Sequence, residues 1–328
     1  MTARRVPDEV RALLDGHGGR ALMLGHVHPD GDVLGTLLAL GLALESRGWH
    51  VVYGGPHPPP AILDFLPGIE RYRAMSAVHG SFEVAVLTDC PNPDRTEGLI
   101  GQARRVSRRI VNIDHHPDNR GYGDVNWVDA QAAATGELVY ELLVALGVTV
   151  SPAIATNLFA AIHTDTGSFR YSNVTPDTFR IAGALVAAGA DPALVSRHLY
   201  ERRPPDTLRL LAEVLARVQV SEDGRVAWLS LPGGLVPEAF VEAEDLVTYP
   251  RSIGSVQVAC LFRERDGRVK VSLRGKGETD VRQIAARFGG GGHRNAAGCS
   301  VAGSLEGVTK DVLGAVAQAV APTGIPAG

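Results

Sequence analysis

The chain has 328 residues, is 45% hydrophobic and 21% charged, and carries a formal net charge of −4. These fractions are ordinary for a soluble globular protein, and the acidic balance does not by itself suggest a nucleic-acid partner. The apolar runs are too short to span a bilayer, which excludes a membrane-spanning protein, and no secretory signal is present. Three cysteines without CxxC spacing favour reduced thiols. We therefore expect a cytoplasmic protein, and its length predicts two domains.

The first half of the chain alternates short apolar runs with amphipathic segments. These runs predict four buried strands, at residues 21–25, 50–53, 84–88 and 109–113. The amphipathic segments predict helices at residues 33–47 and 135–146. Strands that alternate with helices indicate an α/β fold, with a mostly parallel sheet covered by helices on both faces.

The pattern is helical from residue 152 to about residue 215, with breaks at Asp191-Pro192 and Pro204-Pro205. A smaller mixed sheet is predicted after it, with strands at residues 217–220, 226–231, 255–263 and 269–274 and a closing helix at 305–320. We therefore predict one domain over residues 1–190, a helical linker over 191–215 and a second domain over 216–328.

A segment rich in metal-binding side chains follows the first predicted strand, with the sequence His26-Val27-His28-Pro29-Asp30-Gly31-Asp32. Carboxylates and imidazoles mixed in this way are ligands for Mg²⁺, Mn²⁺ or Zn²⁺. Pro29 and Gly31 predict a tight turn in which alternate side chains converge. His26 is favoured over His28 as a ligand because it lies closer to the end of the strand.

Three further segments place acids or histidines at the ends of apolar elements. Asp89 follows the strand at 84–88, and Asp114-His115-His116 follows the strand at 109–113. Asp165 ends an apolar helical run that also contains His163, which is predicted to be a core histidine or to support a ligand. In open α/β sheets the ligand site lies outside the carboxyl ends of the strands, so these segments are expected to converge.

The number of carboxylates in these segments suggests a pair of metal ions. Four of them, Asp30, Asp32, Asp89 and Asp165, would balance the charge of two divalent cations. Without metal, carboxylates this close would repel one another and some would bind protons. Asp89 is suited to bridge both ions.

A basic, glycine-rich segment closes the second half. Residues 251–294 contain ten Lys or Arg and four Asp or Glu, and Gly289-Gly290-Gly291-Gly292 leads into His293 and Arg294. Consecutive glycines allow the backbone to approach a ligand closely and to present N–H groups to an anion. Arg274, at a predicted strand end, adds a further phosphate donor. The segment therefore predicts a turn that binds a phosphate or nucleotide.

Together these motifs resemble the DHH superfamily of phosphoesterases. The residues that carry the resemblance are His26-Val27-His28-Pro29-Asp30-Gly31-Asp32, Asp89, Asp114-His115-His116 and Asp165. The segment from Gly290 to His293 resembles the DHHA1 substrate-binding domain. The length and the stretch from Thr166 to Tyr171 are most similar to the NrnA type, which combines oligoribonuclease and pAp phosphatase activity.

The resemblance implies roles for individual residues. Two Mn²⁺ ions are implied, with Mg²⁺ or Co²⁺ as alternatives, one held by His26, Asp30 and Asp89 and the other by Asp32, Asp89, His115 and Asp165. His116 would face the scissile phosphate, Asp114 would orient the histidine pair, and Asp89 would serve both ions in catalysis. The implied substrate-binding residues are Arg274, Gly291, Gly292, His293 and Arg294.

The implied function is a cytoplasmic Mn²⁺-dependent phosphoesterase and exonuclease. It would degrade short RNA or DNA oligonucleotides to mononucleotides and dephosphorylate pAp, through attack on phosphorus by a hydroxide that two metal ions activate. Alternatives are a phosphodiesterase for cyclic or linear dinucleotides such as cyclic di-AMP or pApA, a RecJ-like single-strand exonuclease, and a non-catalytic nucleotide sensor. A pyrophosphatase of the DHH type is disfavoured by the glycine-rich segment. A homodimer is expected from frequency alone.

Overall fold

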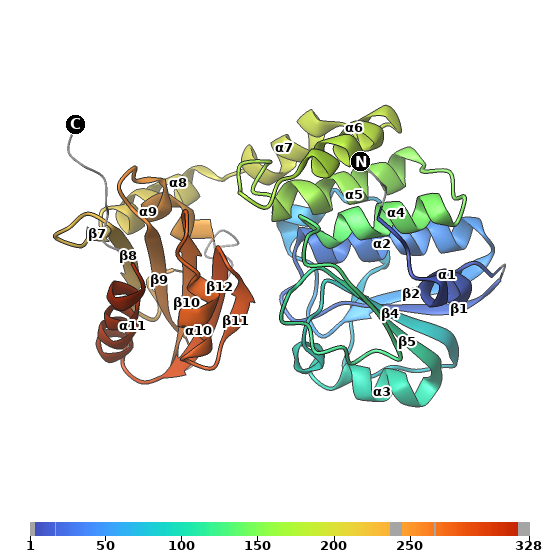
Figure 1. Ribbon diagram of the computed structural model, residues 1–328, viewed down its shortest axis with the longest axis horizontal. Coiled ribbons are helices and arrows are strands. Elements are labelled where there is room, and N and C mark those ends of the chain that lie inside the picture. Colours follow the sequence, from blue (N-terminus) through green and yellow to red (C-terminus); the bar gives the residue numbers. More distant parts are fainter. Residues whose placement is uncertain (1–3, 17, 237–244, 266, 321–328) are drawn as a thin grey trace. The chain divides into compact units, whose positions relative to one another are not determined.

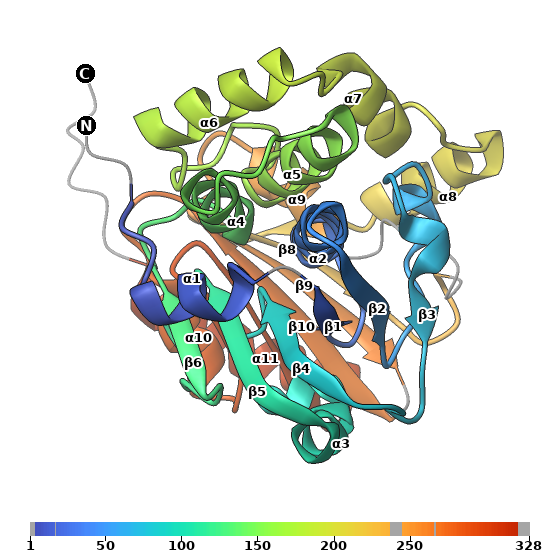
Figure 2. The same cartoon turned by 90° about the vertical axis from the view of Figure 1, so that its right-hand side faces the viewer.

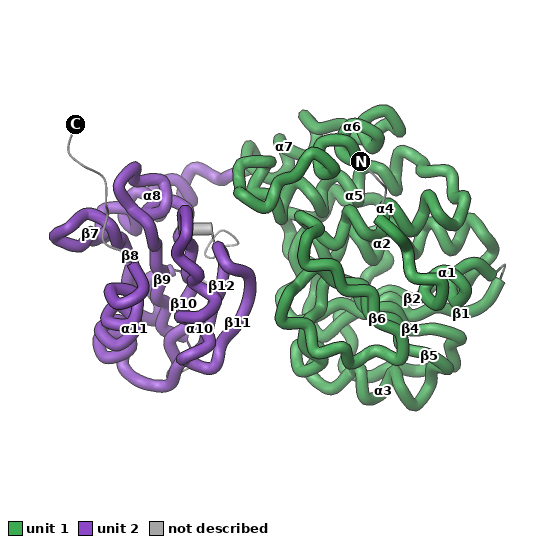
Figure 3. The backbone as a smooth tube through the Cα atoms, viewed as in Figure 1, with its two compact units in different colours: residues 1–202 green, residues 203–328 purple. Residues whose placement is uncertain are grey.

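The computed structural model describes residues 4–16, 18–236, 245–265 and 267–320 (Figure 1). The chain divides into two compact units, unit 1 over Met1–Arg202 and unit 2 over Arg203–Gly328 (Figure 3). Among the described helices, no single one is long and apolar enough to cross a membrane. The helices α6 (Pro176–Ala187) and α7 (Pro192–Tyr200) reach that length and hydropathy only as a pair, and they are bent by 105°.

Unit 1 is built on a parallel sheet of six strands in the order β3-β2-β1-β4-β5-β6. Its strands are β1 (Gly19–Leu24), β2 (Trp49–Gly55), β3 (Arg73–Ala74), β4 (Phe82–Thr88), β5 (Ser107–Asp114) and β6 (Val125–Val128). The four predicted strands and the mostly parallel sheet are confirmed. The strands β3 and β6 escaped prediction because they have only two and four residues, too few for a recognisable period.

Helices cover both faces of this sheet, as the sequence predicts (Figure 2). Alternate residues of β1 point to opposite faces, so Leu22 and Leu24 pack with the residues of α3 while Ala21 and Met23 pack with the larger helical layer. Besides α6 and α7, the helices of unit 1 are α1 (Asp8–Leu14), α2 (Gly31–Ser46), α3 (Leu99–Val106), α4 (Thr135–Ala145) and α5 (Pro152–Asp165). Short 3₁₀ turns are at Ala61–Leu63, Ile69–Arg71 and Pro93–Thr96.

The helices α2 and α5 meet closely at Gly35. A Cβ atom added there would lie 2.4 Å from the carbonyl oxygen of Asn157 and 3.0 Å from the Cβ of Ala161. We therefore expect Gly35→Ala to lower the free energy of unfolding by about 1–3 kcal/mol, because the helices must separate. This loss opposes the gain that alanine normally gives in a helix. Urea unfolding measures the effect.

Gly314→Ala provides the control for this substitution. Gly314 lies in α11 (Leu305–Ala319), and nothing stands within 4 Å of a Cβ added there. Gly314→Ala is expected to be neutral or stabilising. If Gly35→Ala were equally harmless, the close approach of α2 and α5 would be contradicted.

Unit 2 contains a mixed six-stranded sheet in the order β11-β12-β10-β9-β8-β7, in which β8 and β9 are parallel and the other pairs antiparallel. Its strands are β7 (Gln219–Val220), β8 (Val226–Leu231), β9 (Val258–Arg265), β10 (Arg268–Gly275), β11 (Gly291–His293) and β12 (Ala296–Ala302). Residues of α8 (Pro205–Leu215) and α9 (Thr248–Ser252) pack on one face, and those of α10 (Val281–Ala286) and α11 on the other. The predicted mixed sheet and closing helix are confirmed.

The glycine-rich segment is only partly the turn that the sequence predicts. Gly291 and Gly292 belong to β11, which pairs with β12. A Cβ atom on Gly290 would lie 2.1 Å from the carbonyl oxygen of Gly298, and one on Gly292 would lie 2.6 Å from that of Ala296. The prediction of a continuous turn is therefore wrong here, because these glycines allow two backbone segments to lie against each other.

Candidate metal centre

The predicted ligands of unit 1 come from elements that end at one edge of its sheet. His26 follows β1, Asp89 follows β4, and Asp114 ends β5. The carboxyl ends of neighbouring parallel strands lie side by side, so these three segments converge. Helices supply the remaining carboxylates, which are Asp30 and Asp32 at the start of α2 and Asp165 at the end of α5.

Three groups of side chains at this edge are spaced closely enough to hold a metal ion. In each group, one donor atom of every residue lies within 4.8 Å of the donor atoms of the others. The groups are His26 with Asp30 and Asp89, Asp32 with Asp89 and His115, and Asp89 with Asp114 and His116. Asp89 belongs to all three and is the centre of the cluster.

Asp89 is held in an unusual backbone conformation, with φ at +53°. This left-handed region is costly for most residues, and such strain is often found at functional sites. The carboxylate is 3% exposed and accepts a hydrogen bond of 3.1 Å from the hydroxyl of Thr135. Burial alone would raise its pKa, but the adjacent His116 and His115 hold the pKa of Asp89 below its ordinary value.

His26 presents one ring nitrogen to the cluster. Its Nδ1 lies 2.7 Å from the carbonyl oxygen of Val27, which can only accept, and 3.3 Å from Nη2 of Arg95, which can only donate; the shorter contact places the proton on Nδ1. The lone pair is therefore on Nε2, which is buried and makes no hydrogen bond to any described residue. Burial and the nearby Arg95 lower the pKa of His26 to about 3. A neutral imidazole with a free nitrogen is the form that binds a metal ion.

His115 follows the same rule. Its Nδ1 lies 3.1 Å from the carbonyl oxygen of Ala132 and carries a proton, so Nε2 is the nitrogen that faces the cluster. Burial lowers the pKa of His115, but the charges of Asp165 and Asp89 raise it well above its ordinary value. That Nε2 lies 3.3 Å from a carboxylate oxygen of Asp89, 3.3 Å from one of Asp165 and 3.9 Å from one of Asp32. The structure therefore brings Asp165 into the cluster through His115.

The two remaining acids of the cluster begin α2. Asp32 is 1% exposed, and its carboxylate accepts the backbone N–H groups of Thr135 and Gly136 at 2.7 and 2.9 Å. Burial and the charges of Asp89 and Asp165 raise the pKa of Asp32 well above its ordinary value. The residue Asp30 is exposed to solvent in part. Desolvation of its carboxyl group and the negative charges of Asp89 and Asp165 nevertheless raise the pKa of Asp30 to about 7.

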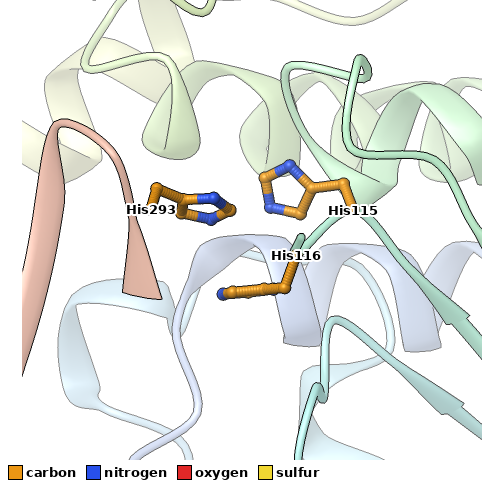
Figure 4. A group of neighbouring side chains, drawn as sticks. All are labelled: His115, His116 and His293. Carbon is orange, nitrogen blue, oxygen red and sulfur yellow. The ribbon is translucent and has the colours of Figure 1, made fainter. Parts of the chain in front are cut away.

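His116 and Asp114, which form the third group with Asp89, are also hydrogen-bonded to each other. The ring of His116 stands 5.0 Å from that of His115 at an angle of 72° (Figure 4). Its Nδ1 donates to Asp114 at 2.8 Å, and the other oxygen of Asp114 accepts from the Asn119 amide at 2.5 Å. Burial opposes protonation, but Asp89 and Asp114 together raise the pKa of His116. The third ring in the figure, His293, belongs to unit 2.

These residues fit a divalent metal ion. Metal-binding histidines typically donate their other N–H to a carbonyl or carboxylate, and His26 and His115 both do so. The raised pKa values of Asp30 and Asp32 express a crowding of negative charge that a divalent cation would relieve. The cluster therefore has the donors, the tautomers and the charge of a metal centre.

Three contributors to the site were missed in the sequence. The backbone and hydroxyl of Thr135 hold Asp32 and Asp89, and the guanidinium of Arg95 stands 3.3 Å from Nδ1 of His26. Asn119 holds Asp114. No sequence motif marks these residues. Asn119 follows the Asp114-His115-His116 sequence by three residues, and this proximity is the signal that could have identified it.

His163 takes the place expected of a core histidine. It is 5% exposed, and its ring lies 5.7 to 5.8 Å from those of Phe159, Phe169 and Tyr200. An aromatic environment of this kind keeps the ring neutral, and burial lowers the pKa of His163 to about 4.

In unit 2, two predicted substrate-binding residues share one face of the sheet. Arg274 in β10 pairs with Ala296 in β12, which pairs with His293 in β11. Directly opposed residues point to the same face, so Arg274 and His293 lie about 10 Å apart on it. The neighbouring Leu273 and Ala297 point the other way, into the core with α10 and α11.

The other predicted residues of unit 2 lie nearby in the chain. Arg294 directly follows β11, and its guanidinium lies 2.7 Å from the carboxylate of Glu278. Gly291 and Gly292 form the part of β11 that opposes Gly298 and Ala297. The donors therefore gather around the end of β11, and Arg274 and His293 lie on the face of the sheet opposite α10 and α11.

Comparison with known proteins places both units. Residues 20–162 match the family model described as the DHH family N-terminal domain, and residues 241–321 match the DHHA1 domain. A bifunctional oligoribonuclease and PAP phosphatase NrnA of Thermus thermophilus is 34% identical over 91% of this chain and 90% of its own. The protein of that name from Bacillus subtilis is 28% identical over 84% of this chain and 87% of its own. The crystal structure of an exopolyphosphatase-related protein from Bacteroides fragilis gives a TM-score of 0.84 with 26% identity and covers 95% of both chains.

Proposed function

The chain belongs to the DHH family and carries a DHHA1 domain, and from this we propose that it hydrolyses short oligonucleotides to mononucleotides and dephosphorylates pAp. The resemblance to this family that the sequence indicates is confirmed. The relatives from Thermus thermophilus and Bacillus subtilis are named for both activities and match most of this chain, which supports the assignment.

The observation that carries the proposal is the sharing of Asp89 among all three close groups of donors. We propose that His26, Asp30 and Asp89 hold one Mn²⁺ and that Asp32, Asp89, His115 and Asp165 hold the other, with Mg²⁺ or Co²⁺ as substitutes. Two such ions supply Lewis-acid stabilisation of a phosphoryl group and lower the pKa of bound water. The residues themselves fix the tautomers and exclude water from most of the cluster.

We propose that His116 acts on the substrate directly and that Asp114 acts through His116, by orienting its ring. Asp114 accepts the Nδ1 proton of His116, so Nε2 is the nitrogen that can exchange a proton with the oxygen that leaves phosphorus. Asp114 is fully buried and its second oxygen accepts from Asn119, so the carboxylate is held in place to orient the ring. The pair therefore resembles the histidine–carboxylate part of other hydrolytic sites.

The substrate-binding residues of the proposal lie in unit 2. Arg274, His293 and Arg294 are cationic or hydrogen-bonding groups suited to a phosphate, and Gly291 and Gly292 place a strand without side chains beside them. We keep the division into a catalytic domain over residues 1–190, a linker over 191–215 and a substrate domain over 216–328. We also propose a homodimer that acts in the cytoplasm, where the free thiols of its three cysteines would stay reduced.

A panel of substrates tests the proposed function. Protein stripped of metal with EDTA is assayed on pAp, pApA, cyclic di-AMP and labelled RNA of increasing length, with and without Mn²⁺. Without metal no substrate should turn over, because the carboxylate cluster then lacks its cations. With Mn²⁺ we expect the highest kcat/KM for pAp and the shortest RNA, and a steady fall with length.

Each other result of the panel favours a different reading. Faster turnover of cyclic di-AMP than of pApA would indicate a cyclic-dinucleotide phosphodiesterase. Undiminished cleavage of long single-stranded DNA would indicate a RecJ-like exonuclease. Binding of nucleotide and metal with no turnover of any substrate would indicate a sensor. Each of these would replace the proposed function.

A further inference from the structure

A residue near the N-terminus, Arg4, contacts the segments that hold several side chains of the metal cluster. We propose that Arg4 is a positioning residue for the metal ligands. It holds the start of α4, which fixes Asp32 and Asp89, and it holds the turn that orients His115. This inference rests on the proposed function, because it assumes that the cluster binds metal.

Arg4 uses each of its three guanidinium nitrogens. Nη1 lies 2.8 Å from a carboxylate oxygen of Glu137, and Nε donates to a carboxylate oxygen of Asp129 at 3.0 Å. Nη2 donates to the carbonyl oxygen of Gln131 at 3.3 Å. The side chain is only 13% exposed. A planar fork of donors can join three partners in this way, whereas a lysine offers a single point charge.

The first branch runs through α4. Glu137 is completely buried, and its other carboxylate oxygen accepts from the hydroxyl of Thr178 at 2.6 Å. Glu137 lies in the first turn of α4, two residues after Thr135, whose backbone and hydroxyl bind Asp32 and Asp89. A shift of this turn would therefore disturb two carboxylates of the cluster together.

The second branch runs through the turn that precedes α4. Asp129 accepts the backbone N–H of Gln131 at 2.9 Å, and its carbonyl oxygen accepts that of Ala132 at 3.1 Å. The carbonyl oxygen of Ala132 in turn accepts from Nδ1 of His115 at 3.1 Å. By holding Asp129 and Gln131, Arg4 fixes the carbonyl group that sets the tautomer of His115.

A simpler role for Arg4 would be to neutralise the buried charge of Glu137 and nothing more. Removing one partner of a buried ion pair leaves the other uncompensated and destabilises the fold. The two roles are separable. Removing the charges of both Arg4 and Glu137 leaves no uncompensated buried charge, but Asp129 and Gln131 still lose their hydrogen bonds to the guanidinium of Arg4. A variant that lacks both charges therefore distinguishes positioning from neutralisation.

The test compares Arg4→Met, the double variant Arg4→Met/Glu137→Gln, and Arg5→Met as control. Arg5 adjoins Arg4 but is 87% exposed and pairs only with the equally exposed Asp8 among the contacts of its side chain that the structure gives. Isothermal titration of metal-free protein with MnCl₂ gives the Mn²⁺ affinity. Thermal unfolding in EDTA gives the stability of the metal-free fold.

We expect Arg4→Met to weaken Mn²⁺ binding by about 10–100-fold, the range typical of residues that orient metal ligands. In EDTA, the double variant should regain the thermal midpoint of the metal-free wild type. Its affinity for Mn²⁺ should stay as weak as that of Arg4→Met. Arg5→Met should match the wild type in both. At saturating Mn²⁺ the KM for pAp should be unchanged in all three variants. Arg4 belongs to unit 1, whereas the predicted substrate-binding residues belong to unit 2.

Two results would overturn the inference while leaving the proposed function intact. One is wild-type Mn²⁺ affinity in a folded Arg4→Met protein. The other is recovery of full affinity in the double variant, which would reduce Arg4 to a neutralising charge. If the wild-type protein itself bound no Mn²⁺, the proposed function and this inference would fall together.

Discussion

Asp89→Asn should lower kcat for pAp by at least about 10³-fold, since metal ions contribute several kcal/mol to such reactions and each 1.36 kcal/mol is a factor of ten. Asp89 is the donor common to all three groups of the cluster. An asparagine amide carries no charge and binds a divalent ion weakly, so both proposed ions lose a ligand. Titration with MnCl₂ should show binding severely weakened, and Mn²⁺ should no longer raise the thermal midpoint.

Asparagine is the appropriate replacement because of the backbone at this position. The φ of Asp89 is +53°, a region that asparagine tolerates and alanine does not. Loss of activity in Asp89→Asn therefore reports on the carboxylate rather than on backbone strain. Asp94→Asn is the control, because that aspartate is exposed and pairs with the exposed Arg120 at 3.3 Å. Full Mn²⁺-dependent activity in Asp89→Asn would refute the shared-ligand assignment.

His116→Asn should lower kcat by about 10²–10⁴-fold, the usual contribution of general acid–base catalysis. The affinity for Mn²⁺ should stay close to that of the wild type, because Nδ1 of His116 is already engaged by Asp114 at 2.8 Å. The contrast with Asp89→Asn is therefore a loss of rate without a loss of metal. Steady-state kinetics at saturating Mn²⁺ and calorimetric titration measure the two quantities.

His50→Asn serves as the control for this second substitution. His50 is an exposed residue of β2, and its replacement should leave both rate and affinity unchanged. If the rate of His116→Asn recovered at high Mn²⁺, His116 would be a metal ligand instead of a group that acts on the substrate.

The strands that carry the site could be predicted because they are continuous apolar runs buried on both faces. The rule that ligands gather at the carboxyl ends of parallel strands then places His26, Asp89 and Asp114 at one edge before any coordinates are known. The structure adds the distances, the tautomers and the strained φ of Asp89, which depend on neighbours far away in the chain.

Other parts of the site could not be read from the sequence. Arg4 meets Asp129 across 125 residues, and nothing local to either position marks the pair. The glycine run shows the opposite problem, since its composition fits both an anion-binding turn and a close strand pair. The strand pairing of Gly291 and Gly292, and the clash that a Cβ on Gly290 would make with Gly298, identify the packing role.

The way Asp32 meets α4 makes the two proposed metal positions unequal. Both oxygens of Asp32 accept N–H groups from the first turn of that helix, where the helix dipole amounts to about half a positive charge. Part of the carboxylate charge is thereby compensated before any cation arrives. An ion bound by Asp32 would keep more of its own charge than one bound by Asp30, which accepts a single such bond. The fold would thus give the two proposed ions different electrophilic strengths, although Asp89 would be a ligand common to both.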